Sequence, residues 1–340
     1  MDNKKVYHSH FNKAKSGDAH DIDCAEFFIN EGILSAGWSK IESEKKMTTI
    51  EEYKEAFLKQ YSSINWNKQG VHYLFENVQK GDYVWITNRG VYYVAEITKS
   101  PEDSFKFDNS KEFLKYDSAP HIEGLEWIRV GTEECVPGSV STAKGRLRST
   151  IQKIDNGDEL TRDNDKKQYT TTSFYAKHLI NREKKFYDNP EPPEINRDKI
   201  FSFLDPSSLE DLVAMFLFNK YGYIVIPSTN KISTQSYEYV MIDPKSDSGK
   251  KIYVQTKNGA VDITSNNYQE LVLENRENEV WLLTTRGRID KIKNNHFVKM
   301  TAEGLEEFQL TQLVDFLFNE RNTHVIPPYI KKWIEMFHWR

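Results

Sequence analysis

Three short segments in the second half of the chain carry side chains that could bind a metal ion and hydrolyse a phosphodiester. They are Leu209-Glu210-Asp211-Leu212-Val213, Ser236-Tyr237-Glu238-Tyr239-Val240-Met241-Ile242-Asp243 and Ile252-Tyr253-Val254-Gln255-Thr256-Lys257. Residues two apart on a strand share a face, so we expect Gln255 and Lys257 to point the same way. Mg²⁺ takes hard oxygen ligands. An ammonium group beside such ligands could stabilise the charge of a phosphoryl-transfer transition state.

These side chains need one helix and two paired strands to bring them together. Pro206 and Ser207 open a predicted helix over 208–220, whose apolar face carries Leu209, Leu212, Val213, Phe216 and Leu217. The pattern predicts strands over 223–227, 237–242, 252–257 and 280–284, with helices near 268–273 and 310–318. Residues 200–340 are therefore expected to form an α/β domain.

Taken in order, these segments resemble the Mrr-like branch of the PD-(D/E)xK nuclease superfamily. That branch shows a Phe/Leu-Glu-x-Leu-Val helix, a Gly-Tyr entering a strand, an acid on the next strand and a Val-Gln-x-Lys strand. The matches are Leu209-Glu210, Gly222-Tyr223, Glu238 and Val254-Gln255-Thr256-Lys257, within about 200–320. The resemblance implies DNA hydrolysis with Mg²⁺ (or Mn²⁺). Its metal ligands would be Glu210, Glu238 and Gln255, with Lys257 as the further catalytic residue.

The sequence departs from the family pattern at one position. The acid on the middle strand is usually Asp, whereas here it is Glu238, whose side chain is one methylene longer. Asp243 is a rival ligand at the far end of that strand, but its neighbour Pro244 indicates a turn. Each residue alone also fits a structural role. Glu210, for example, could be an ordinary acidic residue near the start of a helix, where the helix dipole favours it. The set favours a nuclease, because a Glu on the edge of an apolar strand needs a partner or a metal.

A basic stretch follows the last predicted strand of this set. Five basic residues stand against one acid, Asp290, over residues 286–299: Arg286, Arg288, Lys291, Lys293 and Lys299. Such a stretch suits contacts with DNA phosphates. A solvated hairpin explains the same charges equally well.

The first half of the chain, residues 1–154, predicts a mostly-β, barrel-like domain with a few helices. Helices are expected over 22–31 and 50–61, and a strand over 127–130. The runs 83–87 and 91–97 flank the turn Asn88-Arg89-Gly90 and predict a β-hairpin.

This half resembles an EVE-type domain of the PUA-like superfamily, over about residues 5–154. The resemblance rests on the segments Gly32–Ser39, Lys80–Ile86 and Tyr92–Ile97, with 127–130 and 145–151 as closing strands. It implies a domain that flips a modified base out of a nucleic acid and holds it in an aromatic pocket, where stacking and edge hydrogen bonds offset the flipping cost.

Three of the four tryptophans in this half are candidates for that pocket. Trp38 is favoured, because Gly37 allows close backbone approach and Ser39 could bond a base edge. Trp66, flanked by Asn65 and Asn67, is expected to be partly exposed and comes second. Trp127 is left undecided, and Trp85, between Val84 and Ile86, is expected in the core. Packing in the domain interior is the alternative for each of them.

Composition sets the remaining limits. A length of 340 residues suggests two domains, joined by a charged, Pro-containing linker over 155–199. Within this linker, an amphipathic stretch over about 172–187 predicts a helix. Aromatic residues make up 13%, which excludes global disorder, and a net charge of −5 excludes a wholly basic binder. The chain has no P-loop motif, no apolar run long enough for a membrane span and no secretory signal, and its two cysteines form no metal cluster. We therefore expect a cytoplasmic protein with no nucleotide cofactor and no membrane partner.

A modified-base reader joined to a nuclease indicates a type IV-like, modification-dependent restriction endonuclease. Such an enzyme would cut foreign DNA, such as phage DNA, that carries modified bases, for example modified cytosines. A double-strand cut needs two active sites, so we expect a homodimer or pairing on DNA. Two alternatives stay open: a modified-nucleic-acid binding protein whose nuclease fold is inactive, and an RNA-directed nuclease.

Overall fold

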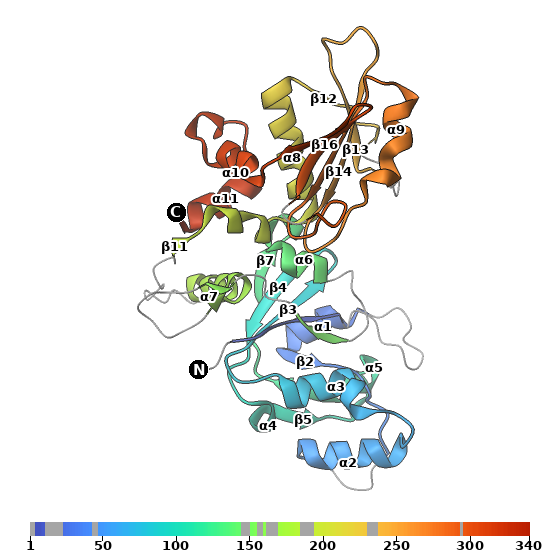
Figure 1. Ribbon diagram of the computed structural model, residues 1–340. Helices are drawn as coiled ribbons and strands as arrows, with labels where there is room; N and C mark the ends of the chain where they lie inside the picture. The colour runs from blue at the N-terminus through green and yellow to red at the C-terminus, as the bar shows by residue number, and fades with distance from the viewer. Residues whose placement is uncertain are drawn as a thin grey trace. The chain divides into compact units, whose positions relative to one another are not determined.

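The computed structural model describes residues 4–10, 23–42, 47–143, 150–154, 159–160, 169–183, 194–229, 237–292 and 295–340. The chain divides into two compact units, Met1–Glu191 and Pro192–Arg340 (Figure 1). Both units mix helices with sheets. No helix in the described part of the chain has the length and apolar character that crossing a membrane would need.

A five-stranded sheet forms the centre of the first unit, in the order β7-β4-β3-β1-β8. Its strands are β1 (Val6–Ser9), β3 (Tyr83–Asn88), β4 (Val91–Glu96), β7 (Ile128–Gly131) and β8 (Ile151–Lys153). β1 pairs in parallel with β3, and the other pairs are antiparallel. The predicted hairpin is confirmed as β3–β4, and its turn places Arg89 and Gly90 at φ 48° and 82°, which matches the right-handed twist of the strands.

A second, three-stranded sheet contains β2 (Ile33–Ser35), β6 (Pro120–Glu123) and β5 (Phe105–Phe107), in the order β2-β6-β5. The described strands do not close into the barrel expected from the sequence. The reason lies in pairing: the strand at 33–35 joins β6 in this separate sheet instead of extending the five-stranded one.

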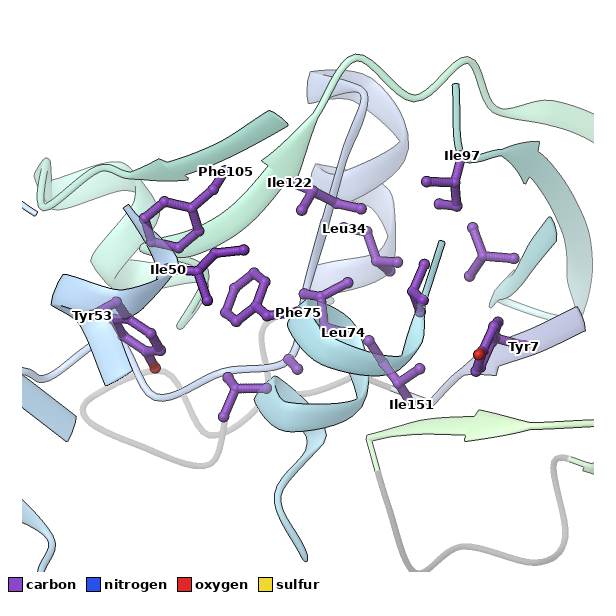
Figure 2. Close-up of a cluster of buried hydrophobic side chains, with 14 of the residues drawn as sticks. Tyr7, Leu34, Ile50, Tyr53, Leu74, Phe75, Ile97, Phe105, Ile122 and Ile151 are labelled. Atoms are coloured by element: carbon purple, nitrogen blue, oxygen red, sulfur yellow. The ribbon is translucent and has the colours of Figure 1, made fainter. Parts of the chain in front are cut away.

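Short helices cover these sheets: α1 (Cys24–Glu31), α2 (Ile50–Gln60), α3 (Gly70–His72), α4 (Pro101–Ser104), α5 (Lys111–Lys115) and α6 (Gly138–Ala143). Thr49 and Glu52 form a capping box at the start of α2, which satisfies otherwise unpaired amides. Figure 2 shows the apolar core that these elements enclose, which extends from Tyr53 past Phe75 and Leu34 to Tyr7.

Helix α7 (Thr171–Glu183) belongs to the first unit, although its residues fall inside the range expected to be a linker. It packs on β4 and β7. The Tyr175 ring is stacked parallel to Trp85 with centroids 6.3 Å apart, and its hydroxyl donates to the Cys135 carbonyl over 2.7 Å. The predicted linker at 155–199 is thus corrected for residues 171–183. The short strands β9 (Glu159–Leu160) and β10 (Tyr169–Thr170) pair with each other, while 155–158, 161–168 and 184–193 lie outside the described residues.

The second unit is built on a six-stranded sheet in the order β12-β13-β14-β15-β16-β17. Its strands are β12 (Ile224–Val225), β13 (Tyr239–Ile242), β14 (Lys251–Lys257), β15 (Glu279–Thr284), β16 (Phe297–Thr301) and β17 (Gly304–Phe308). β14 and β15 are parallel, and the other neighbours are antiparallel. A parallel pair needs a crossover, and α9 (Gln269–Glu274) supplies it.

Two helices cover opposite faces of this sheet (Figure 1). Helix α8 (Pro206–Tyr221) begins at the N-cap Asp205 and ends at Gly222, whose φ of 80° suits a glycine C-cap. Helix α9 packs through Val272 on Tyr253, whose side chain lies on the face away from α8. The chain then adds α10 (Leu310–Phe318), α11 (Pro328–Met336) and β18 (His338–Trp339), which pairs with β11 (Glu194–Ile195).

Candidate functional site

Three of the predicted site residues meet at one end of strands β13 and β14. One carboxylate oxygen of Glu238, Oε1, accepts hydrogen bonds from Gln255 Nε2 over 2.6 Å and from Lys257 Nζ over 2.9 Å. Gln255 is 1% exposed, whereas the side chains of Lys257 and Glu238 are 41% and 27% exposed. The site is therefore anchored in the sheet at Gln255 and open to solvent at Lys257.

The register of the hairpin explains this geometry. Tyr239 pairs with Val254, and the backbone N–H of Glu238 donates to the Val254 carbonyl over 2.8 Å. Glu238 therefore stands directly before β13, beside Gln255. Since Gln255 and Lys257 both reach the same oxygen of Glu238, the prediction that they share a face is confirmed.

Glu210 approaches this group from helix α8. Burial, followed by the nearby negative charges of Glu238 and Asp211, raises the pKa of Glu210 to about 7, and the cation of Lys257 partly opposes that rise. Such mutual influence requires the two glutamates to lie close enough to repel each other. Glu210 thus lies within electrostatic range of the group that Glu238, Gln255 and Lys257 form at one end of the sheet.

Asp243, the rival ligand, lies at the opposite end of β13. Its carboxylate Oδ1 accepts a hydrogen bond from the backbone N–H of Lys245 over 2.9 Å, and its carbonyl accepts from Ser246 over 3.1 Å. These bonds close a turn, as Pro244 predicted. Asp243 is therefore separated from the group formed by Glu238, Gln255 and Lys257.

The donor set fits a divalent cation through its carboxylates. Burial and then repulsion by Glu238 raise the pKa of Glu210, and a bound cation would offset both by stabilising the charged carboxylate. The fit is weaker at Gln255, which turns its NH₂ group toward Glu238 and toward the Thr256 carbonyl at 3.2 Å. Within the described residues, no cluster of three or more His, Cys, Asp and Glu side chains could hold a metal. Within this group, Glu210 and Glu238 are the two carboxylates that would hold Mg²⁺.

Sequence reasoning missed three neighbours of this group. Asn258 donates from Nδ2 to the Leu204 carbonyl and accepts a hydrogen bond from Thr285 Oγ1 over 2.9 Å. Tyr268 is buried in the core that also contains Val240 and Tyr253, and burial and then the charge of Glu238 raise its pKa. The polar pair Asn258-Gly259 directly after Lys257 was the available signal for Asn258. Nothing local marks Tyr268, because it belongs to the crossover between β14 and β15.

The basic residues separate into two groups. Arg286, Arg288 and Lys291 are exposed. Arg286 follows β15, its backbone N–H donates to the Gly259 carbonyl over 3.1 Å, and it therefore lies beside the end of β14 that carries Lys257. Lys299 instead forms an ion pair with Glu306 and lies over the Trp281 ring, which makes it a structural residue. Lys293 lies outside the described residues.

In the first unit, Trp38 and Ser39 occupy a strained bend. Trp38 has a φ of 67°, which side-chain-bearing residues rarely adopt. Its half-buried ring lies 5.0 Å from Phe57 and 5.1 Å from Tyr61, centroid to centroid. Ser39 is buried, its N–H donates to Asp117 Oδ1 over 2.8 Å, and its hydroxyl accepts from Ala119 N–H over 2.8 Å. The bend that presents Trp38 is thus fixed by its neighbour.

Two of the other tryptophans are buried, and one is half-buried like Trp38. Trp66 is 4% exposed, and its indole N–H donates to Glu76 Oε1 over 2.7 Å, so the expectation of partial exposure is wrong. Its polar neighbours misled, because the chain buries Trp66 alone while Asn65 and Asn67 face outward. Trp127 is half-buried and donates to the Ile33 carbonyl over 3.3 Å. Trp85 is fully buried, as predicted.

Comparisons of the chain with protein-family models, with curated proteins and with solved structures found no match. The interpretation of the site therefore depends on its own geometry, on the Glu238-centred group in the second unit and on the Trp38 bend in the first.

Proposed function

We propose that this protein is a Mg²⁺-dependent endonuclease of the Mrr-like PD-(D/E)xK type, carrying an EVE-like reader of modified bases. One observation carries the nuclease proposal: Glu238 gathers Gln255 and Lys257 on one carboxylate oxygen. The order of elements also follows the expected one, with the Glu210 helix, a strand after Gly222, the acid of Glu238 and then the Gln-x-Lys strand.

In this proposal the residues of the site divide the work. Glu210 and Glu238 hold the cation, which when bound supplies positive charge that polarises a phosphoryl oxygen. Lys257 is the most exposed member of the group. Its ammonium can leave Glu238 for a phosphate and stabilise the negative charge that develops there. Arg286 and Arg288 bind neighbouring phosphates of the DNA backbone.

The reader proposal is carried by Trp38. A half-buried indole on a strained bend, with aromatic rings of Phe57 and Tyr61 beside it, provides a surface on which a flipped base could stack. Selection of modified DNA by this unit would direct cleavage to foreign DNA in the cytoplasm. Two copies of the chain would cut both strands.

A cleavage panel tests the proposal. The full chain is incubated with DNA carrying modified cytosines, with the same DNA unmodified and with RNA of the same sequence, each in Mg²⁺ and in EDTA. We expect cutting of the modified DNA alone, only in Mg²⁺, and none by Lys257→Ala. Cutting of RNA would instead indicate the RNA-directed enzyme. The absence of cutting on any substrate, in Mg²⁺ or Mn²⁺, would reject the nuclease.

A second candidate is a modified-nucleic-acid binding protein without cleavage activity. The observation that favours it is the orientation of the Gln255 side chain, whose NH₂ group faces Glu238 Oε1, whereas the family pattern would turn the amide oxygen toward the metal. Selective binding of modified DNA, measured together with no cutting in Mg²⁺ or Mn²⁺, would establish this candidate.

A further inference from the structure

Two side chains contact helix α8 from positions directly after candidate site residues. Tyr239 follows Glu238, and its phenol donates a hydrogen bond to the backbone carbonyl of Glu210 over 3.0 Å. Asn258 follows Lys257, and its Nδ2 donates to the backbone carbonyl before the N-cap of α8. The strand ends that carry site residues are thus also bonded to helix α8, by Tyr239, and to the residue just before its N-cap, by Asn258.

Strand geometry explains why consecutive residues do these two things. Successive side chains on a strand point to opposite faces. Glu238 and Lys257 bond each other on one face, so the residues that follow them turn toward the other face, on which α8 packs. The placement of the site and of its connections to α8 therefore follows from one alternation.

Both connections are well held. Tyr239 is 2% exposed, so its ring is fixed by the core. The Asn258 amide is oriented by Thr285, whose hydroxyl donates to Asn258 Oδ1 over 2.9 Å and accepts from the Gly259 N–H over 2.7 Å. With Oδ1 engaged in this way, Nδ2 is directed at α8.

We propose that Tyr239 and Asn258 are positioning residues, which fix the first turns of α8 against the strand ends. They set how far the Glu210 carboxylate stands from that of Glu238. This role rests on the proposed function, because the distance between the two carboxylates affects activity only if both bind the same cation. Partners that orient metal ligands typically contribute ~10–100-fold to metal affinity.

The test compares Tyr239→Phe and Asn258→Ala with the control Tyr253→Phe, all in the full chain. Tyr253 bonds Glu274 over 3.0 Å on the opposite face of the same sheet, so its variant removes an equivalent hydroxyl without touching α8. Hydrogen exchange of the peptide 205–215 reports how firmly the first turns of α8 are held. Mn²⁺ titration followed by electron paramagnetic resonance reports the metal affinity of the two carboxylates. We expect faster exchange and ~10–100-fold weaker Mn²⁺ binding in the two test variants, and no change in the control.

Unchanged hydrogen exchange in both test variants would show that Tyr239 and Asn258 do not fix the first turns of α8. Faster exchange with unchanged Mn²⁺ affinity would overturn the positioning role. Tyr239→Phe keeps the buried ring, so it decides the question by itself if Asn258→Ala does not fold. A wild-type chain that binds no Mn²⁺ would overturn the proposed function and the positioning role with it, whereas a loss confined to the two variants supports both.

Discussion

At the scale of single residues, the ion pair between Lys257 and Glu238 could serve either the stability of the fold or the chemistry of the site. A partly exposed pair contributes little to stability, with a median of ~0–1 kcal/mol. Here the same Glu238 oxygen also accepts from the buried Gln255 amide, which fixes the carboxylate in place. A lysine held at a fixed point and left open to solvent is more useful for chemistry than for stability.

Lys257→Ala should therefore remove activity without unfolding the protein. Loss of one contact to the transition state typically costs ~10²–10³ in rate. The matched control is Lys251→Ala, at the far end of the same strand, where the ammonium lies 3.9 Å from Glu274 on the surface. Single-turnover cleavage and thermal melting of both variants check this. Equal rates for the two variants would remove Lys257 from the mechanism.

Glu210 should make stability fall as pH rises through the acid range. Burial and Glu238 raise its folded pKa from 4.5 to about 7, so between those values the folded chain binds more protons than the unfolded chain. Under linkage the free energy of unfolding then decreases with increasing pH across that window. Melting temperatures at pH 5, 6, 7 and 8 without divalent cation should show this slope in the wild type and a smaller one in Glu210→Gln. An identical slope in both would assign it to other groups.

Trp38→Ala should lower affinity for modified DNA by ~1–3 kcal/mol, the usual contribution of one stacked base. Affinity for unmodified DNA should change far less, because phosphate contacts dominate that binding. Since the ring also packs on Phe57 and Tyr61, melting must be followed beside binding. Equal losses on both DNAs with a large fall in melting temperature would mean that Trp38 serves packing only.

At the scale of elements, local patterns predicted most of the fold. The hairpin β3–β4, helix α8 and the Gln-x-Lys strand β14 lie where periodicity and turn residues placed them. Long-range pairing was not predictable in this way. No local signal shows that β1 runs parallel to β3 or that β2 joins β6. The site followed the same rule: Lys257 and Gln255 came from one strand, whereas Tyr239 and Asn258 needed the position of α8.

Helix α7 lies where an amphipathic stretch predicted a helix, but it was assigned to the linker because its surroundings are charged. Its buried residues include Phe174, Tyr175, Leu179 and Ile180. Burying an apolar side chain of this size stabilises the fold by ~1.5–3 kcal/mol relative to leaving it exposed. Removing them should destabilise a domain whose total margin is typically ~5–15 kcal/mol. We therefore expect fragment 1–154 to melt well below fragment 1–191, measured by circular dichroism. Equal melting temperatures would make α7 dispensable for the first unit.

At the scale of the whole molecule, the division after Glu191 predicts that the second unit folds and binds metal by itself. Calorimetric titration of fragment 192–340 with Mg²⁺ should match the full chain. Glu238→Ala should abolish the signal, whereas Asp243→Ala, which alters only a turn at the opposite strand end, should keep it. The reverse result for these two variants would mean that the acidic ligand is Asp243, at the other end of β13.

The position of β1 between β3 and β8 has a consequence for the order in which the first unit is made. Its two partners lie far along the chain: β3 begins at Tyr83, and β8 begins 142 residues after Ser9 (151 − 9). At ~5–20 residues per second of synthesis, β1 waits ~7–30 s before its second neighbour exists. Until then at least one of its edges stays open to other strands. The newly made first unit should therefore depend on protection by chaperones for longer than a domain built from local hairpins alone.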